Sequence, residues 1–287
     1  MELEILRLKD GRSLSYATIG PSDGKPVLFC HSLPGSHVQP AFVHELMPKY
    51  GLRLIAADRP GFGRSDFQPG RTVGDWPADM AELADSLGLE RFSLLGVSAG
   101  SPYVLACCES MPERVERAAI AIGITPDDHS SIIHTAVPAP IGWAVRRSRR
   151  LSHVIHTGLV TGMKRKPERA MAALSKSPSK ADTLLFSRGD VGEFIIAVSL
   201  AAAERGVQGW VYDDWLLSQP WGISPEAIPK ELAVDFWIGG DDPAVPLEHA
   251  ERLAHSVPGA ELHVFPGEGH FSVIFNRADD IFGALAG

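Results

Sequence analysis

The feature that most constrains the fold is a series of short apolar segments alternating with helical patterns. The apolar segments occupy residues 26–30, 52–57, 92–95, 118–124, 234–238 and 261–265. Short, wholly apolar runs of this kind are typical of strands covered on both faces. Helical periodicity occupies residues 72–87, 98–110, 248–256 and 276–286. Strands that alternate with helices indicate an α/β fold, with a mostly parallel central sheet and helices on both faces.

A β-hairpin is predicted to open the chain. Residues 3–8 and 13–19 have the composition of strands, and Asp10-Gly11-Arg12 between them has that of a turn. In the helical pattern 72–87 we expect Asp79, Glu82 and Asp85 to face water, because they lie opposite the apolar stripe.

The alternation stops after residue 125, and helical patterns then follow one another up to residue 229. We therefore predict a helical cap, residues 126–229, inserted into an α/β core domain formed by residues 1–125 and 230–287. The charge distribution supports this division. The whole chain has a net charge of −8, yet residues 146–188 contain eleven lysines and arginines against two acidic residues, Glu168 and Asp182.

Two features of the cap bear on substrate choice, and each also has a plainer interpretation. The basic stretch is expected to be a solvated helical face, but an arginine directed into the site could bind a substrate carboxylate. Four of the six tryptophans also lie in the cap. Aromatic side chains there either line an apolar substrate pocket or hold the cap helices together; they are Trp143, Trp210, Trp215 and Trp221.

The segment Gly96-Val97-Ser98-Ala99-Gly100 is the clearest catalytic motif. It follows a predicted strand and opens a predicted helix, which is the context in which G-x-S-x-G forms a nucleophile elbow. A serine on such a tight turn needs neighbours almost without side chains. The alternative is a plain serine at a helix start, but the context favours Ser98 as a nucleophile.

A serine hydroxyl is a weak nucleophile and needs a base held by a third group. Asp242 follows the strand 234–238, and His270 follows the last strand on a loop that contains Gly267 and Gly269. The chain order Ser98, Asp242, His270 matches that of an α/β-hydrolase triad. Asp241 is the neighbouring alternative for the acid.

Backbone donors must also face the oxyanion that develops during acyl transfer. We expect these donors to be the N–H groups of Ala99 and Leu33, the latter on the loop 31–36 after a strand. His31 on the same loop is the main rival for the base, although its place suits it better to shaping the oxyanion site. A plain Pro-Gly turn is the alternative role of this loop.

Most of the eleven histidines and all three cysteines have plainer roles. His153 and His156 share a predicted helix, but nothing nearby completes a set of metal ligands, so no metal site is predicted. Cys30, Cys107 and Cys108 lie in apolar segments and are expected to be buried free thiols in a reducing compartment.

At the level of the whole chain, the acidic balance argues against nucleic-acid binding, which needs a basic face. Residues 1–8 do not resemble a signal peptide, and the apolar run 194–203 is about half the ~20 residues that span a bilayer. We expect a soluble, cytoplasmic protein without a membrane partner. The sequence does not indicate an oligomeric state.

Together these motifs resemble the α/β-hydrolase fold superfamily, in its capped branch with a serine nucleophile. The match extends over nearly all of the chain outside the cap. It rests on the His-x-x-Pro-Gly loop at 31–35, the segment 58–66, the elbow at 96–100, and the segments 239–246 and 266–270. In that family the acid lies four residues before the proline of its loop, which selects Asp242. The family usually has glycine after the loop histidine, where this chain has Ser32. That side chain would either crowd the oxyanion site or contribute a hydroxyl to it.

The resemblance implies a cofactor-free serine hydrolase that acts on a small ester-like or activated-carbonyl substrate. Dehalogenases and epoxide hydrolases of this branch carry aspartate at the elbow, so Ser98 argues against both. Serine members resemble esterases, lactonases, carbon–carbon bond hydrolases and cofactor-free haloperoxidases. Two alternatives remain open: a carbon–carbon bond hydrolase that uses the same triad, and a non-catalytic ligand receptor on the same fold.

Overall fold

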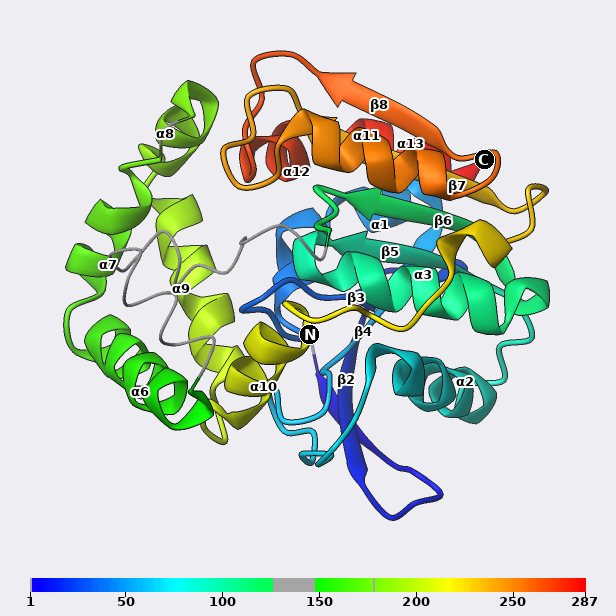
Figure 1. Cartoon of the computed structure of the whole chain (residues 1–287), viewed down its shortest axis with the longest axis horizontal. Helices are drawn as coiled ribbons and strands as arrows, with labels where there is room; N and C mark the ends of the chain where they lie inside the picture. The colour runs from blue at the N-terminus through cyan, green and yellow to red at the C-terminus, as the bar shows by residue number, and fades with distance from the viewer. Residues whose placement is uncertain (1, 126–147, 178) are drawn as a thin grey trace.

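The computed structural model describes residues 2–125, 148–177 and 179–287. Within these residues one eight-stranded sheet forms the centre, in the order β1-β2-β4-β3-β5-β6-β7-β8 (Figure 1). β1 pairs antiparallel with β2, and β2 antiparallel with β4, while all other pairs are parallel. The strands are β1 Leu3–Arg7, β2 Ser13–Ile19, β3 Lys25–Cys30, β4 Leu52–Ala57, β5 Phe92–Val97, β6 Val115–Ala121, β7 Ala233–Gly239 and β8 Glu261–Phe265. The predicted mostly parallel α/β sheet is therefore confirmed.

Helices cover both faces of this sheet. The helices outside the β6–β7 connection are α1 Leu46–Tyr50, α2 Trp76–Ser86, α3 Ser101–Ser110, α11 Leu247–Ser256, α12 Ser272–Asn276 and α13 Ala278–Ala286. Alternate residues of β3 point to opposite faces. Leu28 belongs to the core cluster that includes residues of α2, α3 and α11, whereas Phe29 belongs to the cluster with α1, α12 and α13. This double coverage explains why β3 is apolar on both sides.

Between β6 and β7 the chain forms a group of helices without a strand among the described residues. These helices are α6 Arg149–Arg165, α7 Pro167–Leu174, α8 Lys180–Phe186, α9 Asp190–Ala202 and α10 Gln208–Leu216. Figure 1 shows α6 to α9 beside the sheet, at the left of the view. We refer to this helical group as the cap. The domain boundaries inferred from the sequence remain a prediction.

Two of the differences from the sequence-based expectation have a clear physical cause. β6 covers residues 115–121 rather than 118–124, because Ile122 adopts a left-handed backbone conformation (φ 49°) and ends the extended segment. Asp79, expected to face water, is 4% exposed. The guanidinium of Arg12 donates two hydrogen bonds of 2.6 and 2.9 Å to its carboxylate, so a partner far away in sequence makes its burial possible.

Candidate active site

Ser98 lies on the tight turn that joins β5 to α3. Its φ of +52° is in the left-handed region that side chains rarely adopt. The two flanking glycines allow the turn to pack. A Cβ on Gly100 would lie 2.1 Å from the carbonyl oxygen of Cys30, and one on Gly96 would lie 2.7 Å from Val104. The G-x-S-x-G spacing is thus a packing requirement between the elbow, the end of β3 and α3.

His270 and Asp242 meet Ser98 at the carboxyl ends of the strands. Nε2 of His270 lies 3.2 Å from Oγ of Ser98, and Nδ1 of His270 lies 2.8 Å from Oδ2 of Asp242. A carboxylate only accepts hydrogen bonds, so Nδ1 carries the proton and Nε2 is left to accept from the serine hydroxyl. The structure therefore brings together the three side chains that the sequence singled out.

The loop after β7 presents Asp242 rather than Asp241 to the histidine. The side chain of Asp242 is fully buried, and its Oδ1 accepts hydrogen bonds from the backbone N–H groups of Ala244 and Val245, at 2.7 and 3.0 Å. Asp241 is exposed, and its backbone N–H donates to the carbonyl oxygen of Glu268 on the loop after β8. The two loops are therefore tied directly to each other, which fixes the distance between the acid and the histidine.

The loop after β3 lies next to the elbow, because β3 and β5 are neighbours and Cys30 pairs with Gly96. Leu33 and Ala99, the expected oxyanion donors, are both buried, at 9% and 4% exposed. Their role as oxyanion donors stays a prediction.

His31 has both ring nitrogens engaged within the loop. Nε2 accepts a hydrogen bond from the backbone N–H of Arg59, so the proton is on Nδ1, which donates to the carbonyl oxygen of Ser32 at 2.8 Å. Burial and, secondarily, the charge of Arg59 lower the pKa of His31 well below its usual value. This neutral, fully bonded ring is a structural element of the loop and a poor candidate for the base.

Ser32 makes bonds within the same loop. Its hydroxyl donates to the carbonyl oxygen of Pro34 at 3.0 Å, and its backbone N–H donates to the side chain of Gln39. The hydroxyl proton is therefore used inside the loop, an arrangement that favours neither of the two roles expected for this side chain.

A buried ionic network, which sequence reasoning missed, connects the cap to the catalytic loops. Asp213 of α10 accepts hydrogen bonds from Arg59, Arg71 and Tyr103, and Arg59 also donates to the carbonyl oxygens of His31 and Ser32. Burial opposes ionisation of Asp213, but attraction by the two arginines outweighs it and lowers its pKa. Through Arg59, the network therefore connects the loop after β3 to α10 of the cap.

The tryptophans of the cap are packing residues where the structure describes them. Trp210 and Trp221 are 2% and 7% exposed and belong to the main core cluster, against which Trp215 also packs. Trp221 donates to the carbonyl oxygen of Leu217, and Trp210 packs edge-on against His156. These contacts favour the interpretation that they hold the cap together. Trp143 lies outside the described residues.

The basic stretch of the cap is solvated where it is described. All nine lysines and arginines of residues 148–188 are exposed. Arg146 and Arg147 lie outside the described residues. Arg149 and Arg150 line a pocket of about 330 Å³ with Phe67 and Tyr212, but none of the three triad candidates lines this pocket. The observed exposure favours a solvated face.

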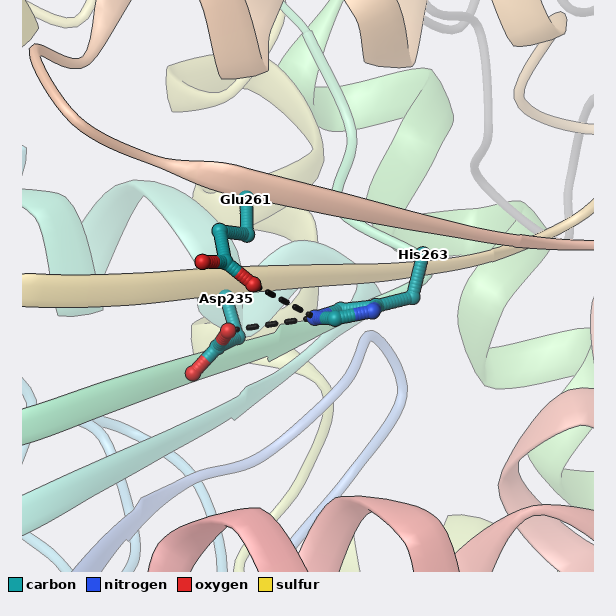
Figure 2. Close-up of side chains that lie close together, drawn as sticks. All are labelled: Asp235, Glu261 and His263. Carbon is teal, nitrogen blue, oxygen red and sulfur yellow. Dashed lines mark hydrogen bonds and ion pairs between the residues drawn. The ribbon is translucent and has the colours of Figure 1, made fainter.

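A second group of ionisable side chains lies on the sheet, on β7 and β8. Figure 2 shows Asp235, Glu261 and His263 converging, with Nε2 of His263 3.1 Å from Asp235 and 3.9 Å from Glu261. The ring of His263 stacks on Trp237, with centroids 4.0 Å apart. A hydrogen bond between histidine and aspartate accounts for this arrangement, so the group does not by itself indicate a metal ion.

The three cysteines are buried and free, as expected. Burial raises the pKa of the Cys30 thiol to about 11, so the group is protonated at neutral pH. A bilayer-spanning helix must be both long and apolar, and the part of the chain that the structure describes contains none of this kind.

The fold and the site define a class of protein: an α/β sheet that carries a serine on a strained turn, with a histidine and an aspartate at neighbouring strand ends. A family model for the alpha/beta hydrolase fold matches residues 25–277. The chain belongs to this family, as the sequence resemblance indicated. The family and the hydrolases among its relatives support a hydrolase enzyme.

Comparison with individual proteins gives a range of activities within the family. A 2-hydroxy-6-oxononadienedioate/2-hydroxy-6-oxononatrienedioate hydrolase of Comamonas testosteroni is 26% identical over 87% of this chain and 82% of its own length. A non-heme chloroperoxidase of Streptomyces lividans is 35% identical, but over only 41% of this chain and 43% of its own. An enol-lactonase of Burkholderia xenovorans has a similar structure, with a TM-score of 0.71 at 18% identity and 98% coverage of both chains. The last likeness concerns the fold alone.

Proposed function

We propose that the protein is a serine hydrolase that cleaves a small ester-like or activated-carbonyl substrate. The observation that carries this proposal is the continuous chain of contacts from Ser98 Oγ to His270 Nε2, at 3.2 Å, and from His270 Nδ1 to Asp242, at 2.8 Å. A nucleophile, a base and an orienting acid within hydrogen-bond reach are the elements that acyl transfer needs.

In the proposed reaction, Ser98 Oγ attacks the substrate carbonyl while His270 Nε2 takes the hydroxyl proton. Asp242 keeps the ring in the tautomer with Nδ1 protonated and stabilises the charged ring that forms. The backbone N–H groups of Ala99 and Leu33 would receive the oxyanion. His270 then returns the proton to the leaving group, and water releases the acyl group by the same steps.

Carbon–carbon bond hydrolysis on the same triad is the second candidate. It is favoured by the relative from Comamonas testosteroni, whose match extends over most of both chains. Such a reaction needs a ketone carbonyl for the attack and a route for a proton to the carbon leaving group. A receptor function is disfavoured by the intact arrangement of Ser98 and His270.

The test combines substrate turnover with active-site labelling. We expect the protein to hydrolyse nitrophenyl esters of graded chain length, and a fluorophosphonate probe to modify Ser98, identified by peptide mapping. A 2-hydroxy-6-oxononadienedioate, assayed in parallel, tests the second candidate. In Ser98→Ala, kcat should fall by a factor of about 10⁶, and labelling by the probe should be lost.

The outcomes separate the candidates. A kcat/KM for 2-hydroxy-6-oxononadienedioate far above that for every ester would make carbon–carbon hydrolysis the principal activity. Labelling and turnover that persist in Ser98→Ala would remove Ser98 as the nucleophile and contradict the proposal.

A further inference from the structure

A carboxylate of the cap lies directly against the loop that carries His270. Asp182 is in α8, yet it is 1% exposed because its side chain is enclosed by the loop after β8. Residues 146–188 contain eleven basic residues and two acidic ones, of which Asp182 is one. An acid that is buried within an otherwise solvated, basic segment needs specific partners.

Those partners are three consecutive backbone N–H groups. Oδ2 of Asp182 accepts from His270 at 3.1 Å, and Oδ1 accepts from Phe271 at 3.0 Å and from Ser272 at 2.8 Å. The Ser177 hydroxyl donates to Oδ2 as well. All three residues lie at the start of α12, where no side chain of α12 caps the helix. The cap residue therefore supplies the acceptor that the catalytic loop lacks.

The loop is shaped to receive this carboxylate. A Cβ on Gly269 would lie 2.3 Å from Ser179 Oγ and 2.7 Å from Asp182 Oδ2, so only glycine lets α8 approach so closely. The Gly269 N–H in turn donates to the Ser272 hydroxyl at 2.7 Å. Both sides of the contact, cap and loop, are thus fitted to each other.

We infer that Asp182 is a positioning residue for His270. Through Asp182, the packing of the cap against the core controls how the ring of His270 is aligned and how readily the ring is protonated. This inference rests on the proposed function, since it assigns His270 the role of base. Asp242 accepts a hydrogen bond from the ring of His270 at Nδ1, and Asp182 accepts one from the backbone N–H of the same residue. Its negative charge also favours the protonated imidazole that forms during the reaction.

Asp182→Asn is the most selective variant. The amide oxygen can keep the place of Oδ1 and the bonds to Phe271 and Ser272, while the NH₂ group takes the place of Oδ2 and faces the His270 N–H, donor against donor. We expect kcat to fall by about ten- to hundredfold with little change in KM, because small displacements of a catalytic group have effects of this size. The rate of fluorophosphonate labelling at Ser98 should fall in parallel.

The pH profile supplies a readout that a purely structural role does not move. Removing a carboxylate near His270 disfavours its protonated form, so the base is available at lower pH. The acid limb of kcat/KM should therefore shift to lower pH. Asp190→Asn is the matched control, because this acid is also in the cap but is exposed and pairs with the exposed Arg188 at 3.4 Å. It should match the wild type in kcat and pH profile.

The outcomes distinguish this inference from the proposed function. If the wild type hydrolyses esters through Ser98 and Asp182→Asn has the same kcat, labelling rate and acid limb, the inference is wrong and the proposed function stands. If the wild type neither turns over any substrate nor reacts with the probe, the proposed function itself fails. If Asp182→Asn does not fold, Gly269→Ala tests the same contact by steric displacement. An unchanged kcat in that variant overturns the inference, and a fall of tenfold or more supports it.

Discussion

At the scale of single residues, the site contains an internal comparison between two adjacent acids. Asp242 is buried and bonded to His270, whereas Asp241 is exposed and contributes its backbone N–H to the neighbouring loop. Asp241 lies in the turn after β7 and Asp242 directly follows it, and it is the side chain of Asp242 that is bonded to the histidine. The proline spacing in the sequence and the geometry select the same residue.

We therefore predict that Asp242→Asn lowers kcat by about 10³- to 10⁴-fold on esters, because the histidine loses the partner that fixes its tautomer. Asp241→Asn should change kcat by less than about threefold, since its side chain takes no part in these contacts. Steady-state kinetics on one nitrophenyl ester checks both variants side by side. A large loss at Asp241 with a small one at Asp242 would transfer the role of the acid.

At the scale of elements, the long cap helix α6 contains two histidines, His153 and His156, whose environments differ. His156 is fully buried against Trp210, and Nδ1 of its ring lies 2.8 Å from the carbonyl oxygen of Ser152. Burial, opposed by this hydrogen bond, lowers the pKa of His156 to about 4. His153, one turn earlier, is exposed. The two residues thus share a helix but differ in burial.

The sign of the pH effect follows from that difference. Between pH 6.5 and about 4 the unfolded chain protonates His156 while the folded chain does not, so folding stability decreases as the pH falls through this range. The loss approaches roughly 3 kcal/mol by pH 4. His156→Leu should lose stability less steeply over this range, and His153→Leu should follow the wild type. Urea unfolding at pH 7, 5.5 and 4.5 measures this, and parallel slopes for all three proteins would contradict it.

At the scale of the whole molecule, ion pairs join the cap to the core in two different environments. Asp213 is buried with Arg59 and Arg71, all three side chains being at most 2% exposed. Glu204 pairs with Arg64 at 2.7 Å, but both side chains are substantially exposed, at 39% and 51%. Asp213 and its two arginines are shielded from water, whereas water screens the attraction between Glu204 and Arg64.

Asp213→Asn should therefore lower the free energy of unfolding by about 3 to 5 kcal/mol, because two buried guanidinium groups lose their counter-charge. Glu204→Gln should cost at most about 1 kcal/mol. Thermal and urea unfolding of the two variants at the same pH compares them. Equal losses would mean that burial of the Asp213 network does not contribute to the attachment of the cap.

The sheet, the helices between β6 and β7, and the chain order of the three triad candidates could all be predicted from the sequence. Strand and helix periodicity is local information, and a turn as tight as the one at Ser98 requires glycines at fixed spacing. Even so, the exact bounds of β6 depended on the conformation of Ile122, and the burial of Asp79 on its pairing with Arg12. Local periodicity contains no information about either.

Which charged groups meet across long separations in the chain could not be predicted from the sequence, because these contacts depend on the folded arrangement. Asp182 contacts the His270 loop 88 to 90 residues away, and Asp213 contacts Arg59 at a separation of 154. A charged residue in an amphipathic helix has the same sequence signature whether it faces water or a buried partner. The free energy that favours burial comes from the partner, and the partner is brought near only by the fold.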